Sequence, residues 1–277
     1  MKKAFWFGIF CFVLGESRVL AETQLKYIIS ESEYKILMDY YGKNPIAEQY
    51  VQKNYYFDTK DLFMKKNGAS LRVRLNKIGH SLNLKIDSVG TGILKKNLSN
   101  NPVFERDEYD CEFAEQSKLP EDLIAGKKTI DSVTEADCKN SINTTLHPVK
   151  ALDLFIEAIK KRYKKGVISA SAKRMQSLAS NETARMEITL SIAGGSVPMT
   201  VDRTVFPDKY FGYEVEFDLK GKTDGEKYKA EIEKLLKTKH NCQIRPSQYS
   251  KSTLTFLIIG KQHSKLSEIL KGSTLFK

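Results

Sequence analysis

Two short stretches far apart in the sequence alternate apolar and charged side chains. Residues 71–75 read Leu-Arg-Val-Arg-Leu, and residues 213–219 read Tyr-Glu-Val-Glu-Phe-Asp-Leu. Alternation with a period of two predicts β-strands, and side chains two residues apart share one face at a spacing of about 7 Å. The first strand therefore presents two arginines, and the second presents three carboxylates. Guanidinium groups bind phosphate oxygens and carboxylates bind divalent cations, so these residues suit the binding of a polyanion together with its metal ions.

The same alternation recurs elsewhere along the chain. Charged and apolar side chains take turns at residues 22–29, 82–86, 103–113, 185–190 and 199–205. A flat antiparallel sheet with helices on one face and water on the other could carry this pattern, and so could a closed barrel whose charges point inward. Closure also removes the exposed edges of a sheet. We expect an α+β fold built on an antiparallel β-barrel, with a charged lumen and with helices packed outside.

Inward-pointing charged faces would place two opposed populations of charge in the lumen. The cations are Lys26, Arg72, Arg74, Lys85, Arg106, Arg185 and one of Lys173 or Arg174. The carboxylates are Glu22, Glu108, Asp110, Glu187, Asp202, Glu214 and Glu216. These groups could simply pair with one another as salt bridges. Because enclosing so many charges without solvent or ligand costs free energy, a wet tunnel that takes up a multivalent anion explains them better.

The length and charge of the chain fit one large domain that meets anions. The chain has 277 residues and a formal net charge of +11 at pH 7. A basic balance favours phosphate compounds, nucleic acid or membrane surfaces as partners. The lysines are scattered rather than gathered into one arm, and no nucleic-acid-binding module has a recognisable pattern. We therefore expect no specific nucleic-acid partner and no transmembrane span, and the sequence leaves the oligomeric state open.

The first 21 residues have the pattern of a secretory signal peptide. Lys2 and Lys3 precede an apolar run at 4–14, and a short polar stretch then ends in Val-Leu-Ala at 19–21. The run is about half the length that a membrane-spanning helix needs, although an uncleaved anchor or a misassigned start would look similar. Cleavage after residue 15 or after residue 21 satisfies the preference for small residues. We expect an exported protein that is secreted, periplasmic or held in the lumen of the secretory pathway.

The remaining chain divides into a tunnel domain at 22–260 and a tail at 261–277. Ser30 and Glu33 form a capping box that predicts a helix ending near Tyr41. Residues near 115–160 show no strand alternation, and we expect a helical and loop excursion from the barrel there. Strands are expected at 167–178 and 184–192, and later helices at 226–239 and 249–259.

The cysteines exclude a disulfide-dense scaffold. Cys11 lies in the predicted signal peptide, and Cys111, Cys138 and Cys242 remain after its removal. None of the three has the spacing of a metal site. One disulfide and one buried thiol are possible, and Cys111 already lies on an apolar strand face.

Taken in order, several motifs resemble the CYTH superfamily, the triphosphate tunnel metalloenzymes. The resemblance lies in Glu22-x-Gln24-x-Lys26, Asn54-Tyr55-Tyr56-Phe57-Asp58-Thr59, Gly68-Ala69-Ser70-Leu71-Arg72-Val73-Arg74, Leu82-Asn83-Leu84-Lys85 and Glu214-Val215-Glu216. It extends from Glu22 to about Leu257. It implies an eight-stranded antiparallel tunnel that binds a triphosphate through basic residues and a divalent metal through glutamate pairs. The family's activities include inorganic, thiamine and RNA triphosphatases and class IV adenylate cyclase.

The resemblance also implies roles for individual side chains. The phosphate-binding residues would be Lys26, Arg72, Arg74, Lys85, Arg174 and Lys251. The metal ligands would be Glu22, Glu108, Asp202, Glu214 and Glu216, with Mg²⁺ or Mn²⁺ as the cofactor. Lys85 is in addition the candidate catalytic residue, because a lysine whose pKa is depressed by burial can transfer a proton.

One position departs from the family pattern. Gln24 stands where the family has the second acid of its ExExK strand. An amide oxygen can bind Mg²⁺, but it carries no negative charge, so one metal ion would bind weakly or not at all. The chain is then either an active enzyme that tolerates this change or a tunnel that binds polyphosphate without turnover.

Three functions follow, and we expect the first. It is metal-dependent hydrolysis of a triphosphate compound, with inorganic tripolyphosphate as the substrate, because an export signal argues against the intracellular tasks of the family. The second is a non-catalytic, exported protein that binds polyphosphate or an organic phosphate. The third is a structural or nucleic-acid-binding protein, which would bind duplex DNA with steep salt dependence and would require neither Arg72 nor a metal.

Overall fold

The computed structural model describes residues 22–87, 103–140, 147–162, 172–219, 225–247 and 249–260. The predicted signal peptide at 1–21 and the predicted tail at 261–277 lie outside these residues. Within the described ranges, no helix combines the length and the apolar character that crossing a membrane takes.

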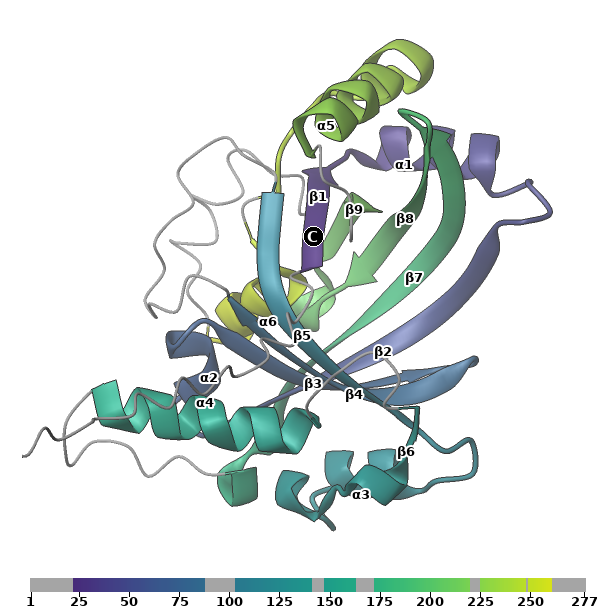
Figure 1. Ribbon diagram of the computed structural model, residues 1–277. Helices are drawn as coiled ribbons and strands as arrows, with labels where there is room; N and C mark the ends of the chain where they lie inside the picture. The colour runs from purple at the N-terminus through teal and green to yellow at the C-terminus, as the bar shows by residue number, and fades with distance from the viewer. Residues whose placement is uncertain are drawn as a thin grey trace, which may run out of the picture.

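A single antiparallel sheet dominates the fold (Figure 1). Its nine strands in the described residues are β1 (Glu22–Ile28), β2 (Glu48–Asp58), β3 (Ala69–Asn76), β4 (Gly79–Asp87), β5 (Val103–Phe113), β6 (Cys138–Asn140), β7 (Gln176–Ile192), β8 (Gly195–Val205) and β9 (Phe211–Asp218). The order in the sheet is β1-β9-β8-β7-β2-β3-β4-β5-β6. Strand β1 also pairs with β5, over Glu22–Leu25. The pairing order therefore runs through eight strands and returns to β1, with the short β6 as a ninth strand beside β5.

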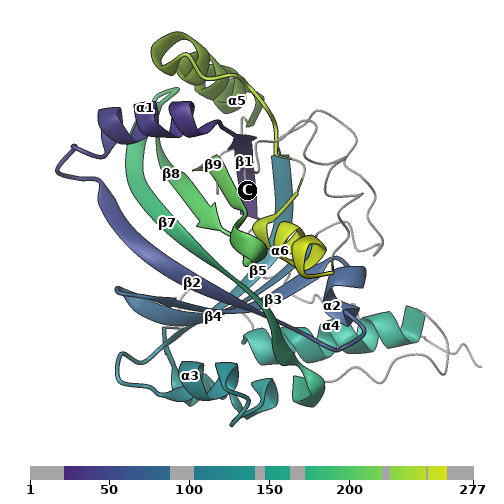
Figure 2. The same cartoon turned by 180° about the vertical axis from the view of Figure 1, so that it is seen from behind.

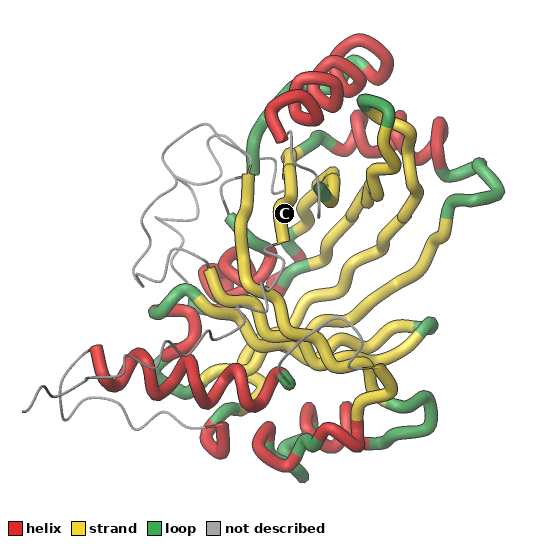
Figure 3. The backbone as a smooth tube through the Cα atoms, viewed as in Figure 1, coloured by secondary structure: helices red, strands yellow, loops and turns green. Residues whose placement is uncertain are grey.

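This order confirms the predicted α+β tunnel, and the curvature of the sheet is plain in Figure 3. Successive residues of each strand point to opposite faces, so the period-two pattern sorts the side chains between the lumen and the outside. On β3, Leu71 and Val73 are buried under outer helices, whereas Arg72 and Arg74 line a cavity inside the sheet. On β9, Val215 and Phe217 are buried outside and Glu216 lines the cavity.

The apolar cores lie between the outer face of the sheet and the helices, on two sides of the tunnel (Figures 1 and 2). Helices α1 (Glu31–Tyr41) and α5 (Gly225–Lys234) cover one core, which contains Leu25, Leu37 and Ile232. Helices α3 (Leu119–Ile124) and α4 (Pro148–Arg162) cover the other, which contains Leu84, Leu123 and Leu152. Because burial of apolar area is the main stabilising term in folding, these two cores leave the lumen free to be polar.

Of two further helices, one follows β2 and the other lies at the end of the described part of the chain. Helix α2 (Phe63–Lys66) follows β2, and Asp58 fixes that turn by accepting hydrogen bonds from the backbone N–H groups of Thr59, Met64 and Lys65. Helix α6 (Lys251–Ile259) begins at the N-cap Ser250, whose hydroxyl accepts a hydrogen bond from the Thr253 N–H.

The segment between β5 and β7 contains the predicted excursion. It holds α3, two short 3₁₀ turns, β6 and α4, with residues 141–146 and 163–171 outside the described residues. A disulfide joins Cys111 on β5 to Cys138 at the start of β6, and Cys242 is a free, buried thiol. The disulfide holds the excursion against the strand from which it leaves.

Local signals predicted most element boundaries, but they missed the short strand β6 and divided β7 wrongly. The capping box of Ser30 and Glu33 is formed, and α1 ends at Tyr41 as expected. Residues 167–171 of the first predicted strand lie outside the described residues. The division between the predicted strands at 167–178 and 184–192 is wrong, because β7 is one strand over Gln176–Ile192 and residues 172–174 form a 3₁₀ turn. Eleven residues of β7 pair with residues of β2 in the antiparallel sheet. This pairing between distant segments keeps β7 a single strand, and the local sequence does not show it.

Candidate active site

Side chains from most strands of the sheet meet in one cavity. Its volume is about 140 Å³, and it is lined by Gln24, Lys26, Gln52, Asn54, Tyr56, Ser70, Arg72, Arg74, Lys85, Glu108, Arg185, Glu216, Ser250, Lys251 and Ser252. The three last residues belong to the N-terminal end of α6, which therefore contributes to the cavity wall. The cavity thus gathers five of the cations that the charge pattern predicts for the lumen, together with Lys251, which the family resemblance predicts.

The two arginines of β3 are held by amides. Arg72 Nε donates a hydrogen bond to Asn83 Oδ1 at 3.0 Å, and Arg74 Nε donates one to Asn54 Oδ1 at 3.1 Å. No carboxylate of the described residues lies within 4.0 Å of either guanidinium. Burial, with Arg72 and Arg185 nearby, lowers the pKa of Arg74 to about 9. The pair is therefore a fixed positive charge that a bound anion would stabilise.

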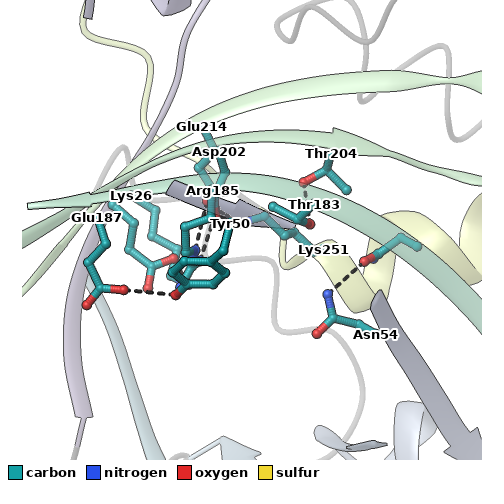
Figure 4. A network of polar contacts seen from close by, with 12 residues as sticks. Lys26, Tyr50, Asn54, Thr183, Arg185, Glu187, Asp202, Thr204, Glu214 and Lys251 are labelled. Carbon is teal, nitrogen blue, oxygen red and sulfur yellow. Dashed lines mark hydrogen bonds and ion pairs between the residues drawn. The ribbon is translucent and has the colours of Figure 1, made fainter. Parts of the chain in front are cut away.

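The opposite sector of the lumen is an ion-pair network (Figure 4). Asp202 on β8 accepts two hydrogen bonds from Arg185, at 2.8 and 2.7 Å, and its Oδ2 lies 3.0 Å from Lys251 Nζ. Lys251 also pairs with Glu214. Lys26 Nζ lies 2.8 Å from Glu216 Oε2. Strand register places these groups together, because Asp202 is opposite Glu214 and Lys26 is opposite Glu216.

Electrostatic interactions within this network stabilise the charged forms of Glu216, Asp202 and Lys251. Burial alone would raise the pKa of the Glu216 carboxyl, but Lys26, Lys251 and Arg185 outweigh burial and hold that pKa well below its usual range. Asp202 behaves in the same way, because Arg185 and Lys251 lower its pKa against the effect of burial. Burial lowers the pKa of Lys251, but the carboxylates of Glu214, Asp202 and Glu216 outweigh burial and raise it.

Lys85, the candidate catalytic residue, lies in the cavity as an ion pair. Its Nζ is 2.8 Å from Glu108 Oε1 on the neighbouring strand β5. Asp110, two residues further along β5, has a pKa raised by burial and by Glu108. Lys85 therefore lines the cavity with its ammonium group paired to Glu108, and its expected roles in phosphate binding and proton transfer stay predictions.

The cavity contains most of the predicted phosphate-binding residues and excludes one. Five of them line it: Lys26, Arg72, Arg74, Lys85 and Lys251. Their roles in phosphate binding stay predictions. The expectation that Arg174 enters the lumen is wrong, because Arg174 is exposed in the 3₁₀ turn before β7. On β7, the arginine that lines the cavity is Arg185. The inward alternation of residues 185–190 already contained the signal for Arg185, but the motif comparison favoured a basic pair upstream.

The predicted metal ligands have different surroundings. Glu214 and Glu216 face the ion-pair network, Glu108 pairs with Lys85, and Asp202 is held by Arg185. The side chain of Glu22 lies outside the described residues. The sequence analysis gave no site role to Gln52 or to Asn54, the first residue of one of the quoted motifs, and both form part of the cavity wall on β2. Neutral amides carry no charge pattern, so only the assembled cavity reveals them.

Comparison with known proteins agrees with this geometry. The model of the CYTH domain family matches residues 20–250 of the chain, which includes every cavity-lining strand. The chain belongs to the CYTH family. No curated protein matches it in sequence.

Two solved CYTH-like structures share the fold at low sequence identity. A candidate adenylate cyclase from Bacillus halodurans is 16% identical, with a TM-score of 0.55, and the match covers 84% of this chain and 96% of that one. A candidate adenylyl cyclase from Hippeastrum, for which a dominant triphosphatase activity is described, is 20% identical, with a TM-score of 0.57 and coverage of 85% and 95%. Family membership supports an activity on triphosphate compounds.

CYTH proteins depend on a divalent metal ion, typically Mg²⁺ or Mn²⁺, and the acidic residues of this chain fit such an ion. Glu214 and Glu216 offer hard carboxylate oxygens from alternate positions of β9. Asp202 is less available, because both of its oxygens hold Arg185. No three carboxylates of the described residues converge within 4.8 Å. That suits Mg²⁺, which usually keeps waters and substrate phosphates as ligands and needs few protein carboxylates.

The ion pair of Lys26 and Glu216 predicts a pH-dependent stability. Glu216→Gln is expected to lower the free energy of unfolding by about 3 kcal/mol at pH 7, because Lys26 is left buried without its carboxylate. The folded-state pKa of Glu216 is depressed, so the contribution is present above the usual glutamate pKa of about 4.3 and is lost as pH falls below it. Urea unfolding between pH 7 and pH 3 should show the difference between the two proteins shrinking on acidification.

The control for this experiment is Glu187→Gln. Glu187 accepts a hydrogen bond from the Tyr50 hydroxyl at 2.9 Å and has no ion pair among the described residues. We expect Glu187→Gln to lower the free energy of unfolding at pH 7 by less than Glu216→Gln does. A Glu216→Gln deficit that stays constant from pH 7 to pH 3 would contradict the prediction.

Proposed function

We propose that this CYTH protein is a metal-dependent hydrolase of triphosphate compounds, and that its substrate is inorganic tripolyphosphate. The observation that carries the proposal is the charge arrangement of the cavity. Arg72 and Arg74 are held by amides on one side, and a row of acidic residues on β9 lies on the other. A linear anion with three phosphates would contact cations from both sides while its metal ion contacts the acids.

Each group has a role that follows from its contacts. Arg72 and Arg74 bind phosphate oxygens with the ends of their guanidinium groups, because Nε of each is already occupied by an amide. Lys26, Lys85 and Lys251 add point charges around the same cavity. Glu214 and Glu216 would hold the divalent ion, which supplies charge neutralisation and a positioned water when bound.

The composition of the cavity wall favours an inorganic substrate. Among the described lining residues, Tyr56 is the single aromatic side chain, and its hydroxyl accepts a hydrogen bond from Asn181. The other lining residues are charged groups, amides and serines. A nucleobase is usually held by apolar or aromatic contacts, which this wall does not offer. The small volume of about 140 Å³ points in the same direction.

The test is phosphate release by the protein without residues 1–15. Tripolyphosphate and ATP are compared with Mg²⁺, with Mn²⁺ and with a chelator. We expect metal-dependent release from tripolyphosphate at a higher kcat/KM than from ATP. Preference for ATP would overturn the substrate, and release that persists in the chelator would overturn the role of the metal.

One observation favours the second function, a binding protein without turnover. Gln24 lines the cavity at a position where the CYTH pattern has an acid, and its side chain is 6% exposed. The site therefore has one negative charge fewer for metal ions. Tight tripolyphosphate binding without phosphate release in either metal would establish this function, and recovery of release in Gln24→Glu would identify the cause.

We propose further that the protein is exported. Two features support this location: the signal-like pattern of residues 1–21 and the disulfide between Cys111 and Cys138, a bond typical of oxidising compartments. Strand β1 begins at Glu22, so cleavage after residue 21 would put the new N-terminal ammonium at the first residue of a cavity strand.

We therefore predict cleavage after residue 15 in the active protein. Mass spectrometry of the protein recovered from its native compartment should find an N-terminus at Glu16 and two fewer thiols than cysteines. An active protein that begins at Glu22 would contradict the cleavage site. Reduced Cys111 and Cys138 in the native protein would contradict export.

A further inference from the structure

A buried chain of hydrogen bonds connects Arg74 to helix α6. Arg74 Nε donates to Asn54 Oδ1 at 3.1 Å, and Asn54 Nδ2 donates to Asn181 Oδ1 at 3.0 Å (Figure 4 shows Asn54). Asn181 Nδ2 donates to Thr255 Oγ1 at 2.9 Å, and Thr255 donates to the backbone carbonyl of Lys251 at 2.7 Å. These contacts link β3, β2, β7 and α6, which are distant in sequence.

The direction of this chain is determined by its two ends. A guanidinium only donates hydrogen bonds and a backbone carbonyl only accepts them. Asn54 must therefore present its oxygen to Arg74 and its amide nitrogen to Asn181. Asn181 in turn accepts with its oxygen from Asn54 and donates with its amide nitrogen to Thr255. A flip of either amide would put two donors or two acceptors face to face. The chain therefore has one arrangement, in which each side chain orients the next.

All the intermediate groups are neutral and shielded from water. Asn54 is 1% exposed, Asn181 is 5% exposed and Thr255 is fully buried. The contrast with Arg185 is informative, because Arg185 is held by the carboxylate of Asp202 and its charge is largely compensated. An amide orients a guanidinium by a hydrogen bond and leaves its full charge for a ligand.

We propose that Asn54, Asn181 and Thr255 form an amide relay that positions Arg74 and Lys251 as one anion-binding unit. The inference rests on the proposed function, in which both cations contact the same polyphosphate. At one end the relay aims the guanidinium of Arg74 into the cavity. At the other end it ties the first turn of α6, and with it Lys251, to the wall formed by β2 and β7. Asn181 is the positioning residue at the centre.

The matched variants are Thr255→Val and Thr255→Ser. Valine keeps the branched shape and removes the hydroxyl, whereas serine keeps the hydroxyl. Tripolyphosphate affinity, measured by calorimetry without metal, is expected to fall about 3- to 10-fold in Thr255→Val, as for one lost hydrogen bond, and to stay near that of the unmodified protein in Thr255→Ser. In turnover assays KM should rise while kcat changes little, because the relay acts on binding.

A double-mutant cycle tests the link to Arg74. Asn181→Ala should weaken tripolyphosphate binding in the unmodified protein and weaken it less in the Arg74→Ala background, where only the link to Lys251 is left to lose. An equal loss of affinity in both backgrounds would overturn the relay, because Asn181 would then act independently of Arg74. Equal affinities in Thr255→Val and Thr255→Ser would overturn it as well.

A second readout needs no ligand and separates this inference from the proposed function. Hydrogen exchange of the Arg74 Nε–H, followed by NMR, should be faster in Thr255→Val than in Thr255→Ser. If the unmodified protein binds no tripolyphosphate but this difference is found, the proposed substrate fails and the positioning of Arg74 stands. If tripolyphosphate binds and exchange is the same in both variants, the relay fails and the proposed function stands.

Discussion

Tripolyphosphate binding is expected to disappear when Arg72 and Arg74 are both replaced by alanine. Each arginine offers charge-assisted hydrogen bonds to phosphate, worth about 1.5–3 kcal/mol apiece, so the double variant should lose about 10²- to 10⁴-fold in affinity. The loss should be this large because, in the described part of the chain, neither guanidinium forms an ion pair with a carboxylate and each is held by an amide. Calorimetry with tripolyphosphate in the absence of metal measures it directly.

The matched control is Arg174→Ala. It removes the same side chain from an exposed turn that does not line the cavity, so it changes the net charge without touching the site. We expect an affinity close to that of the unmodified protein. Arg72→Lys/Arg74→Lys, which keeps the charge but loses the planar fork, should lie between the two. An affinity for tripolyphosphate that stays within about threefold in the double alanine variant would exclude this cavity as the anion site.

The second large effect is expected from Glu214→Gln/Glu216→Gln. This double variant should lose turnover without losing metal-free binding of tripolyphosphate. Turnover should fall by about 10³-fold, because the hard anionic ligands for the divalent ion become neutral amides and the several kcal/mol that a metal contributes to phosphoryl chemistry is lost. Metal-free binding of tripolyphosphate should hold or tighten, because two negative charges leave the lumen and Lys26 and Lys251 lose their carboxylate partners.

Phosphate release measures the turnover of the double variant, and calorimetry on the same preparation measures its binding of tripolyphosphate. Glu187→Gln makes the same chemical change on β7 at a side chain outside the cavity lining, so its turnover should be nearly unchanged. If the double variant keeps more than a tenth of the turnover, Glu214 and Glu216 do not hold the metal. If it loses both turnover and binding, their role is structural.

Local sequence signals predicted the strands and the charged lumen because they depend on neighbouring residues. The alternation at residues 71–75 places Arg72 and Arg74 on one face in any fold that contains this strand. The capping box of Ser30 and Glu33 involves one helical turn, and it is formed as expected. The order of motifs along the chain was also sufficient to indicate the CYTH family, which the match over residues 20–250 confirms.

Partners across the sheet could not be predicted in the same way. Arg174 and Arg185 both belong to basic, alternating segments, and only the register of β7 against β8 places Arg185 beside Asp202 and leaves Arg174 outside. Asn54 and Asn181 are 127 residues apart and carry no charge or period that would connect them. Their contact depends on the pairing of β2 with β7, which is a property of the assembled sheet.

The sequence by itself thus determined which side chains are available to the lumen, since a strand's faces follow from a period of two residues. The tertiary structure decided which of them meet. It divided the cations into those compensated by acids, such as Lys26 and Arg185, and the pair held by amides, Arg72 and Arg74. The physical reason is that charge compensation acts over a few ångströms between strands, and strand register is set by the packing of the whole tunnel rather than by any segment of it.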